Sequence, residues 1–163
     1  MDALVKNRMV LTLPSDLEIV ITREFNAPRR RVFEAWTKPQ HVRQWYGCGE
    51  AQLISCEIDL RVGGDYRYVL IGPDGNEHVM SGRYLEIVAP DRLVYTERYV
   101  SEQFESEEAF VTITFAERDG RTKLTSTVLH KSAANRDMHL NSGVEKGASL
   151  TLDRLEQHLS TMS

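Results

Sequence analysis

Four features are scarce or absent in this 163-residue chain, and each absence excludes a class of protein. The two cysteines, Cys48 and Cys56, are too few for a disulfide framework, and with His41 they match no compact zinc-binding spacing. No apolar run approaches the ~20 residues that cross a bilayer, and the N-terminus lacks a secretory signal. Acidic residues (24) outnumber basic ones (20), so the formal charge of −4 argues against general nucleic-acid binding. No glycine-rich loop carries the lysine and following helix that cradle a phosphate.

These absences lead us to expect a cytoplasmic protein with no membrane insertion, no nucleic-acid partner, no metal and no cofactor. Apolar residues make up 41% of the chain and charged residues 27%, which is typical of a globular domain with a real core. The sequence contains no internal repeat, low-complexity tract or long linker. We therefore interpret residues 1–16 as an N-terminal leader and residues 17–163 as a single domain.

Alternating apolar residues predict strands over most of the chain. The first strand runs from Leu17 to Phe25, and two short helices follow it. One spans Arg29–Trp36, and the other has Pro39 in its first turn and ends at Gly47-Cys48-Gly49. Six more segments then read as strands joined by short turns: Leu53–Asp59, Tyr66–Ile71, His78–Val88, Arg92–Tyr99, Ala109–Phe115 and Thr122–His130. Because these connections are short, neighbouring strands are expected to pair antiparallel.

The last segment, Met138–Leu159, is predicted to be one long helix because apolar residues recur at spacings of three and four. Gly143 and Gly147 each destabilise a helix interior by ~1 kcal/mol relative to Ala, and their spacing would let another element approach closely. Strands grouped apart from helices indicate an α+β fold. We expect a curved antiparallel sheet of six to seven strands, with its apolar face covered by this helix.

A cavity is expected between the sheet and the long helix, because one helix cannot fill the space under a strongly curved sheet. The candidate ligand-binding residues are the aromatic and apolar side chains that could face this space: Trp36, Trp45, Tyr66, Tyr68, Tyr84, Tyr95, Val111, Ile113, Phe115, Leu140 and Val144. Each of them could equally be an ordinary core residue, since aromatic side chains favour strands regardless of function.

Glu97 shares a strand face with Tyr95 and Tyr99, so its position depends on which face is concave. On the concave face it would be a carboxylate in an apolar pocket, with a raised pKa, able to act as acid, base or ligand anchor. On the other face it would be a solvated charge, as lone charged residues usually are. His78 and His130 are further candidates for proton transfer, although a strand histidine is more often a hydrogen-bonded surface residue. No catalytic residue can be assigned from these patterns.

Several stretches of the chain match a known family in the expected order. They read Ile21-Thr22-Arg23-Glu24-Phe25-Asn26-Ala27-Pro28, Val32-Phe33-Glu34-Ala35-Trp36-Thr37-Lys38-Pro39, Trp45, Asp59-Leu60-Arg61-Val62-Gly63-Gly64, Gly82-Arg83-Tyr84-Leu85-Glu86, Pro90-Asp91-Arg92-Leu93-Val94-Tyr95, Ser142-Gly143-Val144-Glu145-Lys146-Gly147 and Leu152-Asp153-Arg154-Leu155. The chain thus resembles the START-like (SRPBCC) superfamily, in the branch named for homologues of the activator of the heat-shock protein 90 ATPase. The resemblance implies the helix-grip fold, in which a curved sheet grips the C-terminal helix around a cavity.

We expect a binding module for a small hydrophobic or lipid-like ligand, because one helix leaves space under the curved sheet. Members of the superfamily that the chain resembles carry lipids, hormones or polyketides, some cyclise them, and the resemblance itself implies no substrate. One alternative is an enzyme of cyclase or hydrolase type, which would need at least two ionisable groups converging in the cavity. The other is a regulatory or co-chaperone-like interaction protein, for instance a homodimer. Co-chaperone activity is not expected, because only about sixteen residues precede the match and leave no room for a chaperone-binding domain.

Overall fold

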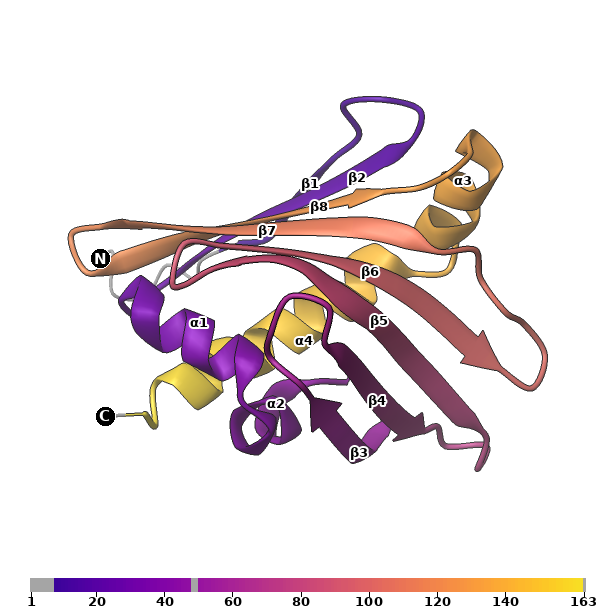
Figure 1. Ribbon diagram of the computed structural model, residues 1–163, viewed down its shortest axis with the longest axis horizontal. Coiled ribbons are helices and arrows are strands. Elements are labelled where there is room, and N and C mark those ends of the chain that lie inside the picture. Colours follow the sequence, from indigo (N-terminus) through magenta and orange to yellow (C-terminus); the bar gives the residue numbers. More distant parts are fainter. Residues whose placement is uncertain (1–7, 48–49, 163) are drawn as a thin grey trace.

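The computed structural model describes residues 8–47 and 50–162, and within them the chain forms eight strands and four helices. All neighbouring strands pair antiparallel, in the order β1-β2-β8-β7-β6-β5-β4-β3 (Figure 1). The elements follow one another as β1 (Val10–Thr12), β2 (Glu18–Phe25), α1 (Arg29–Thr37), α2 (Pro39–Trp45), β3 (Gln52–Ile58), β4 (Asp65–Ile71), β5 (Glu77–Val88), β6 (Arg92–Ser101), β7 (Ala109–Arg118), β8 (Arg121–Leu129), α3 (Ala133–Asn141) and α4 (Val144–Leu159).

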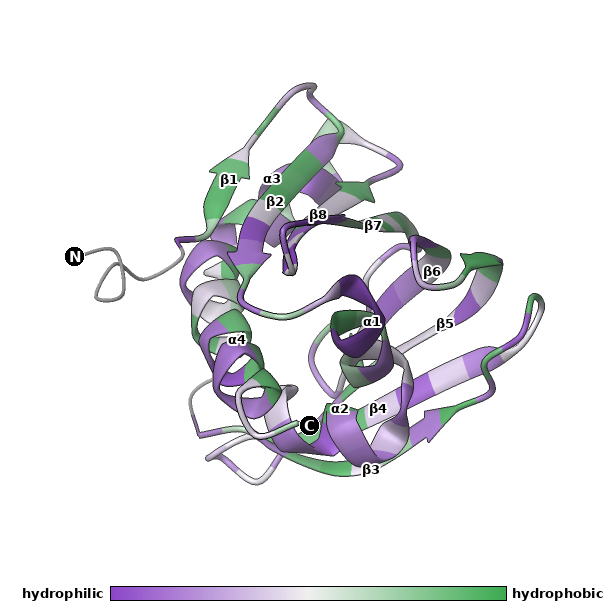
Figure 2. Ribbon diagram, turned by 90° about the vertical axis from the view of Figure 1, so that its left-hand side faces the viewer, coloured by the Kyte–Doolittle hydropathy of each residue, from purple (hydrophilic) through white to green (hydrophobic). Residues whose placement is uncertain are grey.

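The sheet bends into an arc, and α1, α2 and α4 occupy its concave side (Figure 2). α1 lies inside the arc, α2 lies near β3, and α4 crosses the open side between the two edges of the sheet. This arrangement confirms the predicted α+β helix-grip architecture. Within this arrangement α1 contacts β7 and β8, α2 contacts β3, and α4 packs against both α1 and α2.

The strand count is eight rather than the six to seven that we expected. The additional strand, β1, lies in the segment interpreted as a leader and pairs with β2, with Val10 opposite Thr22. The sequence interpretation missed it because three residues are too few to display an alternating pattern.

The expectation of one helix over Met138–Leu159 is wrong, because the chain breaks at Gly143. Gly143 adopts φ +90°, a left-handed conformation that favours glycine, and separates α3 from α4. A Cβ at Gly143 would meet no atom within 4 Å, so this glycine serves the backbone turn and not a close approach. Gly147 lies inside α4, where the Thr151 hydroxyl donates a hydrogen bond to its carbonyl.

Two histidine pairs tie the C-terminal helices to the rest of the domain. His158, at the end of α4, lies 2.9 Å from His41 of α2 between ring nitrogens, and His139 of α3 lies 3.0 Å from His130, just after β8. Burial, with His130 beside it, lowers the pKa of His139 to about 4. Burial also lowers the pKa of His130 and of His158. The His130–His139 pair is therefore hydrogen-bonded between neutral rings near neutral pH.

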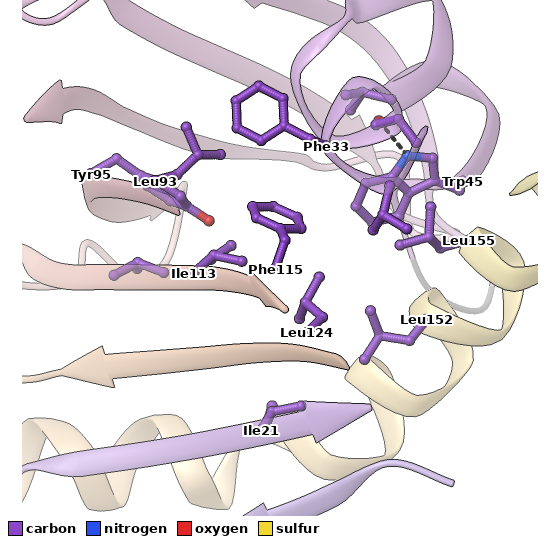
Figure 3. Close-up of a cluster of buried hydrophobic side chains, with 14 of the residues drawn as sticks. Ile21, Phe33, Trp45, Leu93, Tyr95, Ile113, Phe115, Leu124, Leu152 and Leu155 are labelled. Atoms are coloured by element: carbon purple, nitrogen blue, oxygen red, sulfur yellow. Dashed lines mark hydrogen bonds between the residues drawn. The ribbon is translucent and has the colours of Figure 1, made fainter. Parts of the chain in front are cut away.

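The space between α4 and strands β7 and β8 is filled by interlocking apolar side chains (Figure 3). Phe115 and Leu124 of the sheet and Leu152 and Leu155 of α4 are each no more than 5% exposed. The alternation predicted for Ala109–Phe115 is observed, with every second residue buried on the concave face. This half of the concave face is a close-packed core.

We expect Leu155→Ala to lower the free energy of unfolding by about 2–5 kcal/mol, because it leaves a cavity beneath α4. Leu150 lies on the same helix but is 40% exposed, so Leu150→Ala should change stability by no more than about 0.5 kcal/mol. Urea unfolding of the two variants measures both values. Equal losses would contradict the docking of α4 on the sheet described above.

Candidate functional site

A pocket of about 100 Å³ lies between the α1–α2 pair and strands β4, β5 and β6. Seven aromatic side chains and one carboxylate line it: Trp36, Trp45, Tyr46, Tyr66, Tyr68, Tyr84, Tyr95 and Glu97. Here this feature is called the aromatic pocket. It occupies the half of the concave face that α4 does not cover.

Strand alternation brings the sheet residues of the aromatic pocket together. Tyr66 and Tyr68 are two apart on β4, and Tyr95 and Glu97 are two apart on β6, so each pair points to one face. Tyr84 of β5 lies opposite Tyr95 in the register of the two strands. The sheet therefore presents four tyrosines and a carboxylate on one patch of its concave face.

The two tryptophans come from the helices and fix them against each other. The Trp45 indole N–H donates a 2.9 Å hydrogen bond to the carbonyl of Ala35, which links α2 to α1. The rings of Trp36 and Trp45 lie 4.9 Å apart between centroids. Just after α2, the Gly47 carbonyl accepts hydrogen bonds from Thr151 and Arg154 of α4. Contacts among α1, α2 and α4 therefore hold this end of the pocket.

Gly82 makes room for the Tyr66 ring. A Cβ at this position would lie 1.8 Å from the carbonyl oxygen of Thr96 and 2.8 Å from a ring carbon of Tyr66. Because glycine leaves this space open, the Tyr66 hydroxyl reaches the Thr96 carbonyl and donates a 2.8 Å hydrogen bond to it. The glycine of the Gly82-Arg83-Tyr84 motif thus has a direct role in shaping the pocket.

The tyrosine rings contact one another at steep angles rather than stacking. Tyr66 lies 5.1 to 5.6 Å from Tyr68, Tyr84 and Tyr95 between centroids, with interplanar angles of 43° to 84°. Protein partners also engage the hydroxyls, since Tyr68 hydrogen-bonds Tyr84 and Trp36 hydrogen-bonds Tyr95. Burial raises the pKa of all four of these tyrosines, so they stay neutral at physiological pH.

Glu97 is the one carboxylate that lines the aromatic pocket, and it is partly buried. No described residue forms a hydrogen bond or ion pair with it, and burial alone raises its pKa from 4.5 to about 7. Proximity to Glu97 contributes to the raised pKa of Tyr66 and Tyr95, after the larger effect of burial. Glu97 can therefore exchange a proton near neutral pH, or serve as a counter-ion to a bound group.

The structure gathers seven of the candidate residues around this pocket, namely the six aromatic ones and Glu97. It does not add Val111, Ile113 or Phe115, which are at most 2% exposed in the core, nor Leu140 and Val144, which are partly buried beside that core. The general expectation of a solvated Glu97 is wrong, because its strand face is the concave one.

Tyr46 is the lining residue that the sequence interpretation missed. Its ring lies 5.8 Å from Trp45 and 4.8 Å from Tyr68 between centroids. Its position in the sequence could have identified it, because Tyr46 directly follows Trp45, the last residue of α2.

The other candidates lie outside the aromatic pocket. His78 forms a 2.5 Å hydrogen bond with the Tyr99 hydroxyl, and His130 pairs with His139. Cys56 is a buried free thiol, whereas Cys48 falls outside the described residues. Across residues 8–47 and 50–162, no three His, Cys, Asp or Glu side chains are grouped to hold a metal ion. No helix in this part of the chain has the length and apolar character to span a membrane.

We predict that Glu97 makes stability fall as pH rises. Its pKa is higher in the folded protein than in the unfolded chain, so the folded protein binds the proton more tightly. The resulting stabilisation is complete below pH 4.5 and is lost as the pH rises to about 7. The difference corresponds to about 3 kcal/mol. Urea unfolding at pH 5 and pH 8 should show Glu97→Gln gaining stability relative to the unmodified protein at the higher pH. The same pH dependence in both proteins would show that Glu97 does not titrate as described.

Solved structures from several bacteria share this fold. A protein from Rhodobacter sphaeroides is 22% identical with a TM-score of 0.88, and the match covers 95% of this chain and 99% of that one. A protein from Nitrosomonas europaea is 25% identical with a TM-score of 0.81, covering 91% and 97% of the two chains. A protein from Staphylococcus epidermidis is 27% identical with a TM-score of 0.79, covering 93% and 94%.

Among curated proteins, no sequence matches this chain. The sequence profile of one family, described as "Activator of Hsp90 ATPase homolog 1-like protein", matches residues 26–160. The matched range contains every residue that lines the aromatic pocket. It also spans most of the chain, which confirms the resemblance seen in the sequence. This protein therefore belongs to the family of activator of Hsp90 ATPase homolog 1-like proteins.

Proposed function

We propose that this protein binds a small organic molecule in the aromatic pocket. The observation that carries the proposal is that seven aromatic side chains surround about 100 Å³ of space and share it with a carboxylate that has no partner among the described residues. A concave, mostly apolar site with few polar groups is the usual form of a ligand pocket. The family fold supports a ligand-binding or regulatory role in general.

The size of the pocket narrows the class of ligand. Pockets for drug-sized ligands span about 300–1,000 Å³, whereas a cavity of about 150 Å³ accepts benzene. At about 100 Å³ the aromatic pocket encloses roughly four to five heavy atoms, and a larger ring enters it only in part. This favours a compact molecule over the lipid-like ligand that we expected from the sequence.

We propose binding rather than catalysis for this site. An acid–base mechanism needs at least two groups with pKa values suited to proton transfer. Burial brings the pKa of Glu97 to about 7, but it moves those of the surrounding tyrosines further above 10. A cytoplasmic location, a homodimeric state and the lack of a nucleic-acid partner remain predictions from the sequence.

The tryptophan fluorescence of the protein offers a direct test, because both of its tryptophans line the aromatic pocket. Phenol, which has seven heavy atoms, should change the emission in a saturable way, with a Kd on the order of 1 mM or below. Glu97→Phe fills the pocket and should abolish the saturable signal. Circular dichroism of this variant checks that it remains folded.

A second substitution distinguishes the aromatic pocket from the space beneath α4. Val144 lies on α4 outside the pocket lining, so Val144→Phe should leave the phenol titration unchanged. Loss of binding in Val144→Phe with retention in Glu97→Phe would assign the ligand to the space under α4 and contradict the proposal.

A further inference from the structure

The Glu97 carboxylate has no cationic partner in the protein. No Lys, Arg or His of the described residues forms an ion pair with it, and no positive charge lowers its pKa. A buried carboxylate without a partner is unfavourable unless it takes up a proton or a counter-ion reaches it. The aromatic pocket thus contains one negative charge that the fold itself does not neutralise.

The tyrosine hydroxyls cannot supply that neutralisation, because a phenol carries no positive charge. The Tyr66 hydroxyl donates to the Thr96 carbonyl, Tyr68 and Tyr84 share one hydrogen bond, and the Tyr95 oxygen accepts from the Trp36 indole N–H. The pocket therefore offers a ligand chiefly ring surfaces and one carboxylate. An anionic ligand would bring a second negative charge beside Glu97, and the lining contains no cationic side chain to balance it.

Ring surfaces attract positive charge. The face of an aromatic ring carries the negative part of its quadrupole, and tryptophan attracts cations most strongly. The Trp36 and Trp45 rings lie 4.9 Å apart, and the Tyr46 and Tyr68 rings lie 4.8 Å apart, so the lining is a continuous aromatic wall. Aromatic cages of this composition recognise quaternary ammonium groups in other proteins.

We propose that the aromatic pocket is a cage for a small organic cation of the alkylammonium class, with the Glu97 carboxylate as its counter-ion. This inference depends on the proposed function and specifies the chemistry of the ligand at the same site. A tetraalkylammonium ion balances the negative charge of the carboxylate and has no hydrogen-bond donors that need partners. Tetramethylammonium has five heavy atoms and falls within the size range set by the pocket.

Binding of a cation should depend on pH through Glu97. The titratable groups facing it are tyrosines on the three strands and after α2, and the buried ones among them stay neutral through pH 8. Because the free protein holds a proton on Glu97 up to about pH 7, a cation must displace that proton at lower pH. Affinity should therefore rise roughly tenfold between pH 6 and pH 8.

The test compares tetramethylammonium chloride with tert-butanol, a neutral molecule of the same shape and heavy-atom count. Tryptophan fluorescence at pH 8 and constant ionic strength should give at least tenfold tighter binding of the cation. Glu97→Gln keeps the shape of the side chain and should remove both the preference and the pH dependence. Glu77→Gln removes an exposed carboxylate at the start of β5 and should leave both intact.

The outcomes separate this inference from the proposed function. If tert-butanol or phenol binds as tightly as the cation, the cage is refuted while the pocket remains a ligand site. If none of the three probes gives a saturable signal, both the ligand-binding function and the cation cage are refuted. A pH-independent affinity for tetramethylammonium in the unmodified protein would also overturn the role of Glu97, without relying on the folding of any variant.

Discussion

The fold depends on covering the concave face of one strongly bent sheet. A single helix covers only part of such a surface, and the two halves of the sheet are packed differently. Over β7 and β8, side chains of α1 and α4 interlock with Phe115 and its neighbours in a close-packed core. Over β4, β5 and β6, rigid rings meet at steep angles, and the Tyr66 hydroxyl is held by the Thr96 carbonyl. Rings held in this way cannot collapse to fill the remaining space, which is why the pocket lies on this side.

Much of this architecture could be predicted from the sequence, because it rests on local periodicity. Alternation gave seven of the strands with the correct concave face for Ala109–Phe115, and Pro28 and Pro39 marked the starts of both short helices. The aromatic residues of the pocket were also identified, since large rings at alternate strand positions favour burial. The break at Gly143 could have been predicted had its helix-terminating role been weighed against the apolar pattern on either side.

Other features depend on packing that no local pattern records. The sequence does not say which helix covers which half of the sheet, so the cavity was expected beneath α4 and not beneath α1 and α2. Glu97 lies two residues after Tyr95 on one strand, so both face the same side of the sheet, and Tyr95 is buried. The general preference of charged residues for water instead predicts an exposed Glu97. The contact of Gly82 with Tyr66 and Thr96 joins three strands and is visible only in the assembled sheet.

The solved structures that share this fold are 22–27% identical to the chain, so the fold tolerates wide changes in sequence. A shared architecture does not determine what a pocket holds. The ligand chemistry that we propose therefore rests on a few side chains, above all the carboxylate that the aromatic rings surround.

The histidine pair beside α3 has an effect that opposes that of the pocket carboxylate. Because the pKa of His139 falls to about 4 in the folded protein, its protonation favours the unfolded chain, and its contribution to stability grows as pH rises toward 6.5. The contribution of Glu97 declines over the same interval. The two trends offset each other between about pH 4.5 and 6.5, so these two titrations together leave a nearly level stability profile. Such flatness would mask two active proton equilibria within one domain.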